Sequence, residues 1–165
     1  MDISVCVKRV PDTETRISIS DDGTHIDPSG VKYIISPYDE FAVEAALRTV
    51  EGAGDGEVTL VTLGGPDAQE TLRAGMAMGA DQGVLLEGES TTDGLATAKA
   101  LAAELEGADA PLVLLGVKAA DDDQGQVGPM LGVLLDRPTI TGVTSFEVQD
   151  GTVVCQREVE GGVEV

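Results

Sequence analysis

The sequence predicts an α/β fold: a three-layer α/β/α sandwich around a mostly parallel, Rossmann-like sheet of about five strands, with β-hairpins at its periphery. Two observations lead to this prediction. Short, continuously apolar segments alternate along the chain with longer segments in which apolar residues have helical spacing. The apolar segments also lack the alternation of half-exposed strands, which is typical of parallel strands covered by helices on both faces.

The first expected strand is Ile3–Val7, a β-branched run that we place at the centre of the sheet. Cys6 within it is expected to be a small, buried apolar side chain. Lys8 and Arg9 follow directly, where an anionic ligand would meet the sheet, although solvated loop charges are an equal alternative. The other expected strands of the sheet are Glu57–Leu63, Gly83–Leu86, Leu112–Leu115 and Thr139–Val143.

The first expected helix begins at Ser36-Pro37-Tyr38-Asp39. Ser36 can cap the helix, Pro37 suits its first position, and Asp39 can complete a capping box. Gly52-Ala53-Gly54 ends it. The other expected helices are Pro66–Met78, Leu95–Leu105 with Thr92 or Asp93 as its cap, and Val127–Leu135.

Two hairpins are expected outside the sheet. Their strands are Arg16–Ile19 with Thr24–Ile26, and Phe146–Val148 with Thr152–Gln156. His25, the single histidine, has no local partner for a metal or a triad and is expected at the surface. The final run, Glu158–Val165, resembles another strand that lacks an ending. We therefore expect residues 1–165 to form one α/β domain that is incomplete at its C-terminus.

The composition excludes several functions. The formal net charge is −20, from 30 acidic and 10 basic residues, and such a field repels nucleic acid and anionic membranes. The acids are scattered over loops and helices, which favours adaptation to high intracellular salt over a basic protein partner. No apolar run approaches the roughly 18 residues of a membrane span. With two isolated cysteines, no disulfide framework is expected. We expect the protein to be cytoplasmic.

The stretch Leu112–Leu135 is the most informative for function. A strand leads through a polar, glycine-containing loop into a helix, the place where open α/β sheets bind nucleotide phosphates. The aspartates of the loop could contact ribose hydroxyls, cap the helix or hold a divalent cation. Neither a Walker A motif nor a Gly-x-Gly-x-x-Gly motif is present, so a carboxylate metal site and a merely structural acidic loop remain alternatives.

The sequence offers little for catalysis. It has no Cys–His pairing, no Gly-x-Ser-x-Gly elbow and no paired metal ligands. A binding module or a holder of a redox cofactor is therefore favoured over an enzyme.

Five blocks of the chain resemble the β subunit of electron transfer flavoproteins. They are VCVKRVPDTETRI, ISPYDEFAVEAALR, ETLRAGMAMGAD, LLGVKAADDDQGQVGP and DRPTITGVTSFEV. With the acidic composition, the resemblance implies a haloarchaeal member of this family. It implies AMP or FAD in this subunit, FAD shared with an α subunit, and electron transfer from acyl-CoA or other dehydrogenases to a quinone-linked or other acceptor. The chain would be an electron carrier subunit without catalytic residues of its own.

The resemblance also implies the nucleotide site. The residues that match it are Cys6, Ser36, Pro37, Tyr38, Asp39, Leu63, Asp121, Asp122, Asp123, Gln124, Gly125, Gln126, Val127, Gly128, Pro129 and Met130. Ser36 stands where the family usually has Asn. The run Gln126–Pro129 is similar to members that hold a second FAD, whereas Asp122 is not, so the choice between AMP and FAD stays open.

Two other readings compete with this one. The first is a stand-alone adenine-nucleotide binder of the universal-stress type, which would share the fold but lack redox work. The second is a metal-dependent hydrolase that uses Asp121–Asp123, for which Asp12 and Asp39 are the only further candidate ligands.

Overall fold

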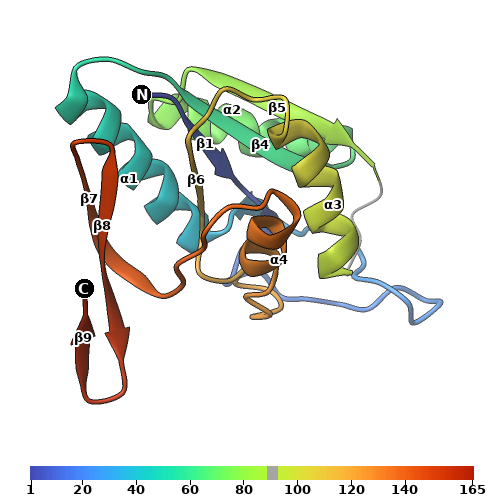
Figure 1. Cartoon of the computed structure of the whole chain (residues 1–165). Coiled ribbons are helices and arrows are strands. Elements are labelled where there is room, and N and C mark those ends of the chain that lie inside the picture. The colour runs from blue at the N-terminus through green and yellow to red at the C-terminus, as the bar shows by residue number, and fades with distance from the viewer. Residues whose placement is uncertain (89–92) are drawn as a thin grey trace.

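The computed structural model describes residues 1–88 and 93–165. Its centre is a four-stranded parallel sheet with the strand order β5-β4-β1-β6 (Figure 1). The strands are β1 (Ile3–Cys6), β4 (Val58–Gly64), β5 (Gln82–Glu87) and β6 (Leu112–Leu115). The central strand β1 is fully buried, Ser4 included, as its mostly apolar, β-branched sequence predicts.

Helices cover both faces of the sheet. On one face lie α1 (Pro37–Ala53) and α2 (Gln69–Met78), the latter preceded by the 3₁₀ turn η1 (Pro66–Ala68); on the other lie α3 (Gly94–Leu105) and α4 (Val127–Leu134) (Figure 1). Successive strand residues point to opposite faces, so Val5 packs beneath α1 while Cys6 packs beneath α3 and α4. The three-layer α/β/α prediction is confirmed.

Two antiparallel elements lie outside the sheet. A short pair consists of β2 (Arg9–Pro11) and β3 (Tyr33–Ile35), which the sequence analysis did not predict. A three-stranded sheet consists of β7 (Val143–Gln149), β8 (Thr152–Val159) and β9 (Gly162–Glu164), and it projects from the body of the molecule near the C-terminus (Figure 1). The second predicted hairpin is therefore confirmed and extended.

Two strand predictions are wrong. Residues 139–142 form no strand, because the chain reverses after α4 with Asp136 at a φ of 52° and then leaves the sheet. Thr139 packs against Gly132 of α4 instead. The predicted hairpin around residues 16–26 is reduced to a single bridge between Ile19 and Ile26, because side-chain hydrogen bonds of Ser20 hold the turn.

The cap of α3 and the position of His25 were also predicted. Asp93 caps α3 by accepting from the N–H groups of Leu95 and Ala96, whereas Thr92 lies outside the described residues. His25 is exposed, as predicted. In the described part of the chain, none of the helices combines the length and the apolar character needed to cross a bilayer.

Candidate functional site

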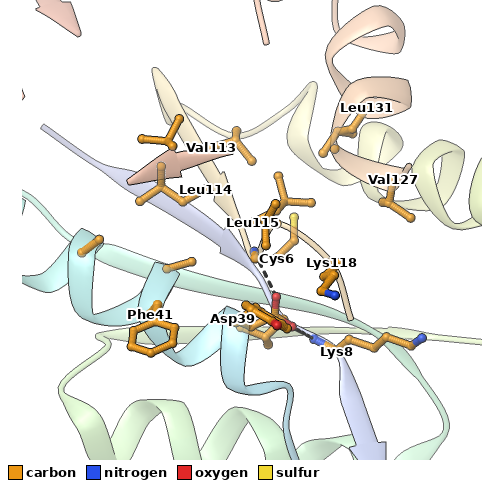
Figure 2. A pocket seen from close by; sticks show the side chains of 18 of the residues that line it. Cys6, Lys8, Asp39, Phe41, Val113, Leu114, Leu115, Lys118, Val127 and Leu131 are labelled. Carbon is orange, nitrogen blue, oxygen red and sulfur yellow. Dashed lines mark hydrogen bonds between the residues drawn. The ribbon is translucent and has the colours of Figure 1, made fainter. Parts of the chain in front are cut away.

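The predicted site residues converge at the carboxyl ends of β1 and β6. These neighbouring parallel strands send the chain to opposite faces of the sheet, β1 towards α1 and β6 towards α4. In open α/β sheets the crevice at such a switch point is where ligands bind. Here it is part of an open hollow that is lined by residues of α1 and α4 and continues along β6 (Figure 2).

Most of the predicted residues line this hollow. They are Cys6, Tyr38, Asp39, Leu63, Asp121, Asp122, Gln124, Gly125, Gln126, Val127, Gly128 and Pro129. Ser36, Pro37, Asp123 and Met130 belong to the same segments but lie beside the lining. The structure thus brings together segments that are separated by more than 100 residues in the chain.

Asp39 is buried at the base of the hollow, only 6% exposed. Its Oδ2 accepts from the backbone N–H of Lys8 at 2.7 Å, and its Oδ1 accepts from the N–H of Gly116 at 3.0 Å (Figure 2). The predicted capping box is therefore wrong, because the carboxylate turns away from its own helix to bridge the two strand ends. Burial raises the pKa of Asp39 to about 7, although the two N–H donors and the nearby Lys8 oppose the shift.

Ser36 precedes α1, as predicted, but its side chain makes no cap hydrogen bond. Its backbone oxygen accepts from the N–H groups of Asp39 and Glu40, and its N–H donates to the carbonyl of Lys8. The hydroxyl oxygen is buried without a hydrogen-bond partner. Leaving such a group unpaired typically costs about 1–3 kcal/mol. Ser36 is fully buried and lies outside the lining of the hollow, so this hydroxyl does not face the open space.

The three aspartates of the loop pair with lysines. Lys8 Nζ lies 2.8 Å from Asp121 and 2.9 Å from Asp122, and Lys118 Nζ lies 2.7 Å from Asp123. Partial burial lowers the pKa of Lys8, but the two carboxylates outweigh it, so the net shift is upward. In the described residues, no three acidic, Cys or His side chains form a group that could hold a metal ion.

Lys118 also lines the hollow, and it is a candidate site residue that was not predicted from the sequence. It pairs with Asp123, which raises its pKa, and its ammonium lies 5.5 Å from the centre of the Tyr38 ring. The signal was available, because Lys118 follows strand β6 in a chain with few cations just as Lys8 follows β1. Two lysines thus flank the hollow and compensate the acidic loop.

The loop ends at α4. The side chain of Gln126 packs against Gly94 at the start of α3 and donates to the side-chain oxygen of Gln124. The first N–H groups of α4, at Val127 and Gly128, have no partner within the helix and carry its positive dipole end. A Cβ at Gly128 would meet no atom within 4 Å, so the space beside it is open. This end of the hollow suits an anionic group.

Cys6 forms the floor of the hollow. The residue is 5% exposed, and burial, followed by the charge of Asp39, raises the pKa of its thiol to about 12. The expectation of a buried, small apolar side chain is confirmed. Leu63, near the end of β4, adds a further apolar wall.

Comparison with known proteins identifies the family of the chain. The model of the electron transfer flavoprotein domain matches residues 24–165. The electron transfer flavoprotein subunit beta of Bradyrhizobium diazoefficiens is 41% identical over 164 residues, 99% of this chain and 66% of that protein. The subunit beta of Bacillus subtilis is 39% identical over 99% of this chain and 64% of its own length. The human subunit beta is 38% identical over 98% of this chain and 65% of its own length.

The chain thus spans 64–66% of the length of these three relatives. The match to the domain model leaves out β1 and β2 and covers the other helices and strands around the hollow. The match to the relatives covers nearly the whole chain. The predicted resemblance is confirmed: the chain belongs to the electron transfer flavoprotein family, and within it to the proteins related to subunit beta.

Proposed function

We propose that residues 1–165 are one adenine-nucleotide-binding domain that holds AMP or FAD in the hollow between α1 and α4. The observation that carries this proposal is the switch-point crevice lined by the first turn of α4, in a chain that is similar to subunit beta of electron transfer flavoproteins. The N–H groups of Val127 and Gly128 would hold a phosphate. Tyr38 and Leu63 offer apolar area to the base.

The proposed role is that of a beta subunit in electron transfer. Together with an α subunit that carries FAD, the protein would accept electrons from acyl-CoA or other dehydrogenases and pass them to a quinone-linked or other acceptor. The bound flavin supplies the redox chemistry. The residues of this chain bind and orient the nucleotide, and they act as a carrier rather than as a catalyst.

We further propose that the protein is cytoplasmic and comes from a halophilic organism. A cytoplasmic location and a halophilic source are consistent with the net charge of −20, and the acidic surface disfavours nucleic acid as a partner. The two choices for the nucleotide differ in consequence, because AMP would be structural whereas a second FAD would allow electron bifurcation.

Co-purification with the α subunit tests the function. The protein is co-expressed with an electron transfer flavoprotein α subunit, and the complex is examined by absorption spectroscopy and by extraction and quantification of its nucleotides. One flavin and one AMP per heterodimer would support simple electron transfer, and two flavins would support bifurcation. A partnerless protein that retains nucleotide but no flavin would contradict the proposal and favour the stand-alone binder.

A further inference from the structure

A closed ring of contacts joins the base of the hollow to its acidic loop. Asp39 accepts from the N–H of Gly116, where the loop leaves β6, and from the N–H of Lys8. The Lys8 side chain then reaches forward to Asp121 and Asp122 within the same loop. Asp39 therefore holds the loop twice, once through the backbone at its start and once through Lys8.

We infer that Asp39 is a positioning residue whose ionised carboxylate clamps the ends of β1 and β6 and thereby keeps the nucleotide loop in its binding arrangement. The inference rests on the proposed function and specifies how the same site is controlled. An ionised carboxylate is an acceptor only, so both of its oxygens can take an N–H. Once protonated, it carries a donor of its own and can no longer serve both Lys8 and Gly116 equally.

The groups around Asp39 define when this change occurs. Cys6 and Lys8 face it from β1 and its end, and Asp121 faces it from the loop. Tyr38 precedes it on α1, with Lys118 above the tyrosine ring. Strand β4 contributes no ionisable side chain. Burial is the largest influence and brings the pKa of Asp39 to about 7, so the clamp changes state near neutral pH.

The test measures nucleotide affinity against pH. AMP and FAD are each titrated into the full chain by calorimetry between pH 5.5 and 8.5 at constant high salt, for the wild type and for Asp39→Asn. The affinity of the wild type is expected to fall about tenfold as pH decreases across this range, which corresponds to a pKa of Asp39 about one unit lower with nucleotide bound than without it. The affinity of Asp39→Asn is expected to be lower and independent of pH beyond the titration of the ligand itself.

A second readout needs neither a variant nor a nucleotide. The backbone amide signals of Lys8 and Gly116 in the wild-type protein are expected to shift together with a common midpoint near neutral pH. Amides that do not titrate, or an affinity with the same pH profile in both proteins, would overturn the inference. Titrating amides in a protein that binds neither AMP nor FAD would instead overturn the proposed function and the control that rests on it, while leaving the clamp itself in place.

Discussion

Gly116 lies directly against Asp39, its N–H donating to the carboxylate at 3.0 Å. This approach is possible because residue 116 has no side chain. A Cβ there would lie 2.8 Å from the carbonyl carbon of Tyr38 and 2.9 Å from the backbone nitrogen of Asp39. Since both are backbone atoms, they cannot rotate away, and Gly116 fixes how closely α1 approaches the end of β6.

Gly116→Ala is therefore expected to lower the free energy of unfolding by about 1–3 kcal/mol, because the added methyl group forces α1 and β6 apart. Urea denaturation at constant salt measures the change. Gly128→Ala is the matched control, because its Cβ meets no atom within 4 Å and alanine favours a helix. Equal stability of the two variants would show that α1 can shift without cost.

Gly128→Asp tests the proposed phosphate position. An acidic side chain in the first turn of α4 favours the helix dipole, so the fold is expected to persist. The same charge would repel a phosphate, and nucleotide retention is expected to fall at least about tenfold. Nucleotide content after gel filtration measures it. Gly128→Asn has nearly the same size without the charge and should retain more nucleotide; identical retention in Gly128→Asp and wild type would place the phosphate elsewhere.

The layers of the fold could be predicted from the sequence because their signal is local. Val5 and Leu60 stand in short, mostly apolar runs, and Val43 and Leu101 stand in longer segments with apolar residues at helical spacing. Each segment therefore indicates its own secondary structure and its buried side. The short run at Thr139 has the same character. Only the turn at Asp136 and the contact with Gly132 keep it out of the sheet, and neither is visible in a local pattern.

The segments that form the site could be predicted from the sequence, but the hydrogen bonds and ion pairs between them could not. The segments could be found because a strand followed by a polar loop and a helix is a local pattern. The partners of Asp39 lie 31 and 77 residues away, whereas its local sequence fits a capping box better than a clamp. The acidic loop likewise suggests ligand contacts when only the sequence is considered. In the structure its aspartates pair with Lys8 and Lys118 instead.

The two cysteines are expected to differ in reactivity. Cys6 is buried and its pKa is raised to about 12, so it carries almost no thiolate at pH 8, whereas Cys155 on β8 is partly exposed. A thiol reagent should therefore modify about one cysteine per native chain and both after denaturation. Cys155→Ser is the control and should leave the native chain unmodified. Rapid reaction of that variant would mean that the floor of the hollow opens to solvent.

Lys8→Gln is expected to weaken nucleotide binding far more than it weakens the fold. The Lys8 side chain is 39% exposed, so loss of its ion pairs should cost less than about 1 kcal/mol of stability. Asp121 and Asp122 would however remain uncompensated beside the phosphate position, and affinity for AMP or FAD is expected to fall about tenfold at low salt. Salt screens exposed charges, so the difference from wild type should shrink at high salt.

Lys32→Gln provides the control for this prediction. It removes an exposed ion pair of the same kind, with Asp12 at 3.0 Å, from a position outside the lining of the hollow. Its nucleotide affinity should match that of the wild type at every salt concentration, because Lys32 does not line the hollow. The two variants change the net charge by the same amount, so only the position of the lost charge differs between them. If the two variants lose affinity equally, the effect belongs to the overall charge of the protein, and Lys8 has no particular role in compensating the loop.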